Sequence, residues 1–306
     1  MAIPINKSQF ESAILFEKSE GIMDKFKDVR SKDLLVADNV VIDLTGAIKR
    51  RDGFTQVKTG LWHSMISVSD GFIGVNDGVL CKVRNDLSIV QLVTVGNYRI
   101  GYVVVFDGEK EVVYCSNGFK VRGESIESWK GSSYVGVQST EAQVADYLDT
   151  PPSGQLLEVF GGRMLVADGN LLRYSEQLDF SLFRRRSFIV FDSDITMLKG
   201  LLSSVYVGEK GRISILEGDD VNKFSIVRAE DFGAILGTGV CVNAGSIGFG
   251  EIGDVLLFTS PQKGICLGNN AGVIQCLTES TVEMGSADIG CAYVNDDNQY
   301  IVSLGG

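Results

Sequence analysis

The acidic side chains that could do chemistry occur in short pairs. Asp192 and Asp194 flank a serine, and Asp219 and Asp220 follow a glutamate and a glycine. Two carboxylates can act as acid and base in glycoside hydrolysis, and clustered acids can bind calcium. An EF-hand loop needs acids at several fixed positions and a closing glutamate, a series that no segment supplies. We therefore interpret both pairs as solvated turn residues.

Nucleophilic and metal-dependent catalysis find little support in the residue types. The sequence has one histidine, His63, so a Ser-His-Asp arrangement would depend on that residue alone. The six cysteines form no C-x-x-C pair and mostly lie in apolar stretches, as buried thiols do. No phosphate-binding GxxxxGK[ST] motif occurs. The sequence predicts no enzyme, no catalytic residue, no metal and no cofactor.

Basic residues cluster twice against an acidic background. Lys49-Arg50-Arg51 and Arg184-Arg185-Arg186 interrupt a chain of 306 residues with a formal net charge of -11. This balance argues against a broad basic face that would hold nucleic acid by its phosphates. We interpret the two clusters as solvated or interface positions. No apolar run approaches the roughly 20 residues needed to cross a bilayer, so no membrane-spanning segment is expected.

The elements that would position these residues are recurring hairpins. Each unit is a short β-rich run, a turn containing glycine and a second run, as in FIGVNDGVLCKV from Phe72. The 36 glycines against 4 prolines fit many tight turns. Alternation is clear where Ile213 and Ile215 point one way and Arg212 and Ser214 the other, which predicts a half-buried sheet. The five turns are Asp77-Gly78, Asn117-Gly118, Asp168-Gly169, Lys210-Gly211 and Lys263-Gly264.

The spacing of the hairpins predicts the architecture. The turn glycines lie 40, 51, 42 and 53 residues apart, which suits four-stranded propeller blades of about 40 to 50 residues. Further hairpins are expected at Thr45-Gly46 and near Asp296-Asp297, where strands from both ends could close one blade or leave an open array. The sequence predicts an all-β, β-propeller-like array of antiparallel hairpins; a β-sandwich or stacked barrels are the alternatives.

Two segments fall outside the hairpin pattern. Residues 1–37 are expected to be an N-terminal arm with a ragged amphipathic helix, and residues 38–306 a single propeller-like domain. A polar insertion near residues 124–155 ends in DTPPSG and is expected to be a surface loop.

Several short motifs resemble a known family. The stretch NVVIDLTGAIKRRDGF from Asn39, the stretch PPSGQLLEVFGGRMLVADGNLLRYSE from Pro151 with the later YVG, and LLFTSPQKGICLG carry the likeness. Over residues 39–54 and 151–306 the chain resembles bacteriophage tail proteins of the tail nozzle and packaged-DNA stabilisation type. The matching motif residues, expected to be structural, are Gly46, Arg51, Gly53, Gly162, Arg163, Gly169, Tyr174, Ser175 and Gly264.

The resemblance implies a virion protein that works by assembly. It implies a β-propeller-like subunit of a nozzle, hub or adaptor-like ring in the tail, assembled in the host cytoplasm with other tail proteins. A homo-oligomeric ring is expected, with six-fold symmetry favoured, and DNA could pass it without specific binding because the chain is acidic. Two alternatives are a cellular interaction scaffold and a glycan-binding or glycan-cleaving tail-tip protein. The carboxylates of glycan cleavage would be Asp192, Asp194, Asp219 and Asp220.

Overall fold

The structure, a computed structural model, describes residues 40–42, 48–50, 56–129, 148–149, 151–218, 221–247, 253–279, 287–295 and 298–305. The chain divides into two compact units, Met1–Thr59 with Thr278–Met284 and Gly60–Leu277 with Gly285–Gly306. In the first unit, β1 (Val40–Ile42) pairs with β2 (Ile48–Arg50), which confirms the first terminal hairpin. Its turn, and the expected N-terminal helix, lie outside the described residues.

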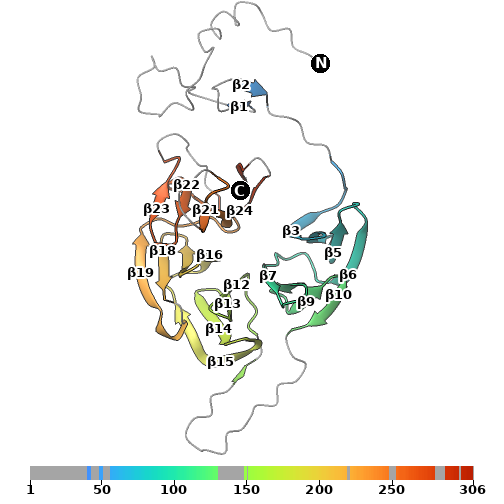
Figure 1. The fold of residues 1–306 in the computed structure, drawn as a ribbon, viewed down its shortest axis with the longest axis horizontal. Coiled ribbons are helices and arrows are strands. Elements are labelled where there is room, and N and C mark those ends of the chain that lie inside the picture. Colours follow the sequence, from blue (N-terminus) through green and yellow to red (C-terminus); the bar gives the residue numbers. More distant parts are fainter. Residues whose placement is uncertain are drawn as a thin grey trace, which may run out of the picture. The chain divides into compact units, whose positions relative to one another are not determined.

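The second unit is a β-propeller of five blades (Figure 1). The hairpin spacing predicted a propeller-like array and not the number of blades. Blade 1 comprises β3 (Trp62–Val68), β4 (Gly71–Asn76), β5 (Val79–Arg84) and β6 (Ile89–Thr94). Blade 2 comprises β7 (Tyr102–Phe106), β8 (Glu111–Cys115), β9 (Phe119–Arg122) and β10 (Ser125–Ser128). Blade 3 comprises β12 (Leu156–Phe160), β13 (Arg163–Asp168), β14 (Leu171–Glu176) and β15 (Asp179–Val190), with β11 (Leu148–Asp149) added to β15.

The remaining strands complete the second unit. Blade 4 comprises β16 (Ile195–Gly200), β17 (Ser204–Glu209), β18 (Ile213–Glu217) and β19 (Ser225–Glu230), with a short 3-10 turn at Val221–Lys223. Blade 5 comprises β20 (Val240–Asn243), β21 (Asp254–Ser260), β22 (Gly264–Gly268) and β23 (Ile274–Cys276). A two-stranded sheet follows, in which β24 (Ile289–Val294) pairs with β25 (Tyr300–Gly305); this is the second expected terminal hairpin.

Every blade is an antiparallel meander whose strands follow chain order. The first strand of each lies toward the middle of the propeller and the last lies at the outside (Figure 1). All five predicted turns join the second strand of a blade to its third. Glycine supplies the positive φ at four of them, and at Asp77-Gly78 both residues have positive φ, 48° and 77°.

The core lies between the blades, and this corrects the expectation of a half-buried sheet. In β13, Leu165 packs toward blade 4, whereas its neighbour Met164 packs toward blade 2. In β18, Ile213 and Ser214 point in opposite directions yet both are buried. Because blades 2 to 5 each contribute to a core cluster on both faces, side chains of both alternating sets enter a core. The inner strands therefore read as nearly continuous apolar runs.

The two-stranded sheet packs on blade 5 in the same manner. Val294 and Tyr300 contact a cluster of Val255, Leu257 and Leu267. The Tyr300 hydroxyl donates to the carbonyl of Thr238 at 2.7 Å. This sheet therefore extends the series of face-to-face contacts beyond the fifth blade. Within the described ranges, no helix is long and apolar enough to cross a membrane.

Candidate functional site

A polar cavity opens where the linkers between blades meet the turns between second and third strands. Its volume is about 510 Å³. Blades 2, 3 and 4 and the linker between blades 1 and 2 contribute to its wall. Its lining includes the polar side chains of Tyr98, Arg99, Asn117, Asp168 and Asp194. We define this cavity as the linker cavity.

Close backbone approach shapes one wall of the linker cavity. A Cβ atom on Gly154 would lie 2.3 Å from the carbonyl oxygen of Ala167, and one on Gly101 would lie 2.1 Å from the carbonyl oxygen of Gln155. Neither position tolerates a side chain without backbone movement. Ser116 adds a fixed contact, since its hydroxyl accepts the Gly101 amide at 3.0 Å. The linker entering blade 3 is thereby held against blade 2.

Arg99 contacts a residue that is far away in the sequence. Its Nη1 and Nη2 atoms donate to the carbonyl oxygen of Gly290 at 3.4 and 3.3 Å, 191 residues along the chain. A Cβ on Gly237 would lie 1.8 Å from Nη2, so the guanidinium occupies space that a side chain there would fill. Burial lowers the pKa of Arg99, which nevertheless stays protonated in proteins. Among the described residues no carboxylate forms an ion pair with it.

Two exposed carboxylates face the same cavity. Asp168 ends β13, and Asp194 lies immediately before β16. The Asp194 Oδ1 atom would lie 3.5 Å from a Cβ on Gly169, which places it close to the β13–β14 turn. In the part of the chain that the structure describes, neither carboxylate accepts a hydrogen bond. Both are therefore available as acceptors.

Asn117 and Tyr98 complete the polar lining. Asn117 Oδ1 accepts the Phe119 amide at 3.4 Å, while its buried Nδ2 lacks a partner among the described residues. Buried polar groups are nearly always paired, so this donor is an exception. The Tyr98 ring is 56% exposed and rests on Gly96, where a Cβ would lie 3.2 Å from the ring. The cavity thus offers donors, acceptors and an aromatic ring.

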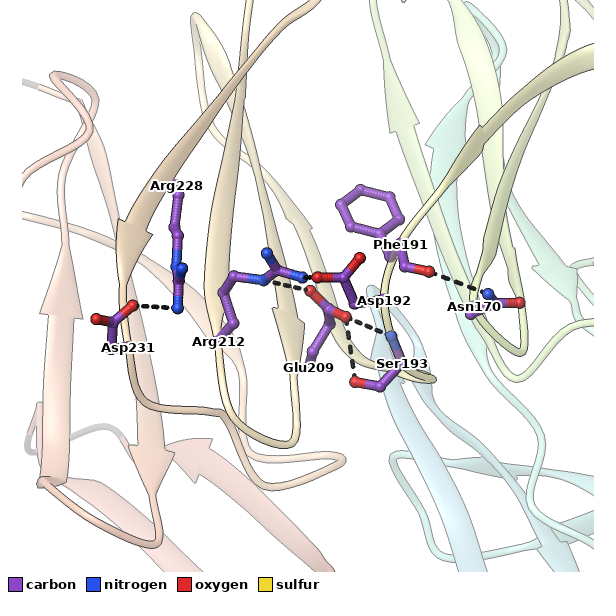
Figure 2. Close-up of polar contacts among 8 residues, drawn as sticks. All are labelled: Asn170, Phe191, Asp192, Ser193, Glu209, Arg212, Arg228 and Asp231. Carbon is purple, nitrogen blue, oxygen red and sulfur yellow. Dashed lines mark hydrogen bonds and ion pairs between the residues drawn. The ribbon is translucent and has the colours of Figure 1, made fainter.

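A second polar cluster, shown in Figure 2, braces the linker between blades 3 and 4. Glu209 is 1% exposed, and its Oε1 accepts the Ser193 amide at 2.6 Å and the Ser193 hydroxyl at 3.1 Å. Its Oε2 pairs with Arg212 Nε at 3.0 Å. Arg212 also pairs with Asp192, which raises the pKa of the guanidinium. Since every charge in this cluster has a partner, we assign it a structural role.

The structure does not bring together the two described carboxylates of the four that glycan cleavage would use. Asp192 is engaged with Arg212, whereas Asp194 faces the linker cavity. Asp219 and Asp220 lie outside the described residues. Over the described ranges, no group of three His, Cys, Asp or Glu side chains is arranged to hold a metal ion.

His63 lies on β3. Its Nδ1 atom is 3.0 Å from the Ser64 hydroxyl oxygen, and that hydroxyl also accepts the Ile100 amide at 3.0 Å. Its Nε2 atom is buried and has no partner within the described part of the chain. These contacts support the structural interpretation of this histidine.

Five of the motif residues make contacts that explain their type. Gly162, Gly169 and Gly264 have positive φ at turns. Arg163 Nη1 donates to the Ser175 carbonyl at 2.7 Å, and the Ser175 hydroxyl accepts the Met164 amide at 2.9 Å. The GR and YS motifs thus lock β13 against β14.

The other motif residues lie in the core or outside the described residues, and one basic cluster lies on the surface. Tyr174 packs against the core between blades 3 and 4. Gly46, Arg51 and Gly53 lie outside the described residues. Arg184, Arg185 and Arg186 are exposed on β15, where Arg184 pairs with Glu176. The cysteine prediction holds for buried Cys81, Cys115 and Cys266, but Cys241 and Cys291 are exposed.

Comparisons with known proteins give no family. No family model and no curated protein matches the chain. Among solved structures, the extracellular domain of BT4673 from B. thetaiotaomicron has a TM-score of 0.48 and 9% identity over 84% of this chain and 33% of its own. BBS1N in complex with ARL6DN gives 0.46 and 12%, covering 87% of each chain. Virginiamycin B lyase from Staphylococcus aureus gives 0.44 and 10%, covering 80% and 84%. This chain spans about a third of the first of these, and none is close enough to indicate a function.

Four of the five polar residues of the cavity are not candidate site residues in the sequence. The sequence marks Asn117 and Asp168 only as turn residues, and Tyr98 and Arg99 lie in a linker with no motif of its own. The pattern GNYRIG carries no signal that would place the arginine beside Gly290. Only the closing of the propeller brings these positions together.

Proposed function

We propose that this protein is a structural component of a bacteriophage tail that acts by protein–protein assembly. The motifs over residues 39–54 and 151–306, which resemble those of phage tail proteins, support the assignment to a tail. A rigid propeller suits a subunit of a nozzle, hub or adaptor-like ring. Under this proposal the protein is not an enzyme, and it resides in the virion after assembly in the host cytoplasm.

The observation that carries the proposal is the outer rim of blades 3 and 4. On β15, Phe188 and Val190 are 43% and 58% exposed, and on β19, Ile226 is 52% exposed. Both are the last strands of their blades and lie at the outside of the propeller (Figure 1). Exposed apolar side chains on strand edges are typical of surfaces that another chain covers.

Charge on the same rim suits a polar border to such an interface. Arg185 and Arg186 on β15 and Arg228 on β19 are exposed. Arginine is enriched at protein interfaces because its guanidinium pairs with carboxylates and packs on apolar surface. Copies of an acidic chain supply many carboxylates, which supports a homo-oligomeric ring alongside contacts with other tail proteins. The six-fold order and the passage of DNA follow from the family resemblance.

The proposal is tested on purified virions by quantitative mass spectrometry. The chain should be present in a fixed ratio to the other tail proteins, and its absence from virions would refute the assignment. Phe188→Glu and Ile226→Glu should reduce incorporation while leaving the thermal unfolding of the isolated protein unchanged. Val273→Glu is the matched control, because Val273 is 51% exposed but lies between β22 and β23.

A further inference from the structure

The linker cavity presents hydrogen-bonding groups of both kinds at fixed positions. Asp168 and Asp194 are acceptors without partners in the described part of the chain, while Arg99 supplies donors. Arg99 uses two of its guanidinium nitrogens only in long contacts to one carbonyl. A ligand rich in hydroxyl groups satisfies such a lining, because each hydroxyl can donate to a carboxylate and accept from an amide or guanidinium.

Tyr98 adds an apolar platform at the edge of the same cavity. Its ring is supported by Gly96 on one side, and 56% of the residue remains exposed. Aromatic side chains bury large apolar area with little loss of conformational freedom, so an exposed ring beside polar groups is suited to a ligand with one apolar face. A pyranose ring combines such a face with a rim of hydroxyl groups.

The charge of the lining selects among hydroxyl-rich ligands. Among the described residues, the cavity lining has one cationic side chain, Arg99, and two carboxylates, Asp168 and Asp194, on a chain of net charge -11. These carboxylates and the negative net charge of the chain would repel an anionic ligand. Ligands with carboxylate or phosphate groups are therefore disfavoured, and neutral ones are not.

We propose that the linker cavity binds a neutral saccharide. Asp168 and Asp194 accept hydrogen bonds from its hydroxyl groups, Arg99 donates to its oxygens, and Tyr98 stacks on its apolar face. A volume of about 510 Å³ is within the usual range for a small-molecule site. The proposal concerns binding of the saccharide and not its cleavage.

This inference does not rest on assembly into a tail. The cavity lies within one propeller, on residues other than the exposed positions of β15 and β19. Saccharide binding by the isolated chain and incorporation into virions can therefore succeed or fail separately.

The test is saturation-transfer NMR on the full-length chain with maltotriose, cellotriose and chitotriose as neutral probes and glucuronate as the acidic one. We expect at least one neutral probe to bind with a dissociation constant of about 1 mM or lower, and glucuronate to bind more weakly. Tyr98→Ala should weaken binding by about tenfold through loss of the stacking surface. Asp194→Asn should also weaken it.

Tyr293→Ala is the matched control, since Tyr293 is a 48% exposed tyrosine on β24 that does not line the cavity. It should leave binding unchanged, and thermal unfolding should confirm that all variants fold. The proposal is overturned if none of the neutral probes binds, if glucuronate binds as tightly as they do, or if Tyr98→Ala and Asp194→Asn bind like the unaltered chain.

Discussion

Replacing Glu209 by alanine should cost more stability than any exposed ion pair can account for. Glu209 is 1% exposed and accepts two hydrogen bonds from Ser193, at 2.6 and 3.1 Å, besides its contact with Arg212. Removing one partner of a buried ion pair typically costs about 3–5 kcal/mol. Arg212 keeps its second partner, Asp192. We therefore expect the free energy of unfolding to fall by about 3 kcal/mol, the lower end of that range.

Urea denaturation followed by tryptophan fluorescence measures this loss, with the m-value showing whether the native state remains compact. Glu209→Gln keeps the shape and one acceptor, so it should cost about 1–2 kcal/mol. Asp231→Ala is the control, because the Arg228–Asp231 pair at 2.5 Å is largely exposed and should contribute little. If Glu209→Ala destabilises no more than Asp231→Ala, the brace between blades 3 and 4 is not what holds the linker.

Three further predictions concern single positions. Gly154→Ala should destabilise by about 1–3 kcal/mol in urea denaturation because its Cβ would lie 2.3 Å from a carbonyl oxygen, whereas Gly211→Ala, with nothing within 4 Å, should be neutral. Burial raises the pKa of Cys115 from 9.0 to about 12. The contribution of this thiol to stability is therefore full below pH 9 and is lost as the pH rises toward 12. Cys115→Ala should flatten that part of a curve of unfolding free energy against pH, and an unchanged slope would contradict the prediction. Lys82 is buried and pairs with Asp70 at 2.6 Å. Lys82→Met should nevertheless change the unfolding free energy by less than about 1 kcal/mol, because the Asp70 side chain is 62% exposed and stays solvated without its partner, and an apolar residue of similar volume avoids desolvating the charge. A thermal melt well below that of the unaltered chain would refute this.

The fold was accessible from the sequence because turn chemistry is local. Asp77-Gly78 and Asp168-Gly169 mark their turns through the conformations that glycine permits, and neighbouring hairpins repeat at blade length. The face-to-face packing was harder to infer. Ser214 looks like a solvent-facing residue of an alternating strand, but a neighbouring blade buries it. Alternation with a period of two residues indicates that a strand has two faces. It does not indicate whether solvent or another blade covers each face.

The linker cavity could be predicted only in part. Asp194 was identified as a candidate carboxylate, but so was its neighbour Asp192, and the sequence offers nothing that separates a residue paired with Arg212 from one that faces a cavity. Arg99 meets Gly290 across 191 residues, a distance at which local patterns carry no information. The site depends on the angle between successive blades, which is set by packing and not by any motif.

Consecutive side chains of one strand pack against two different neighbouring blades, and this arrangement affects how the propeller unfolds. Met164 and Leu165 adjoin in β13 but stabilise different interfaces, so each blade is coupled to the next as units of a repeat array are coupled. Local opening should then spread from blade to blade, and amide hydrogen exchange should be slowest where a strand has packed blades on both faces. The β24–β25 sheet, with two strands and one shared core cluster, should exchange soonest among the described sheets of the propeller unit and set the point from which unfolding advances.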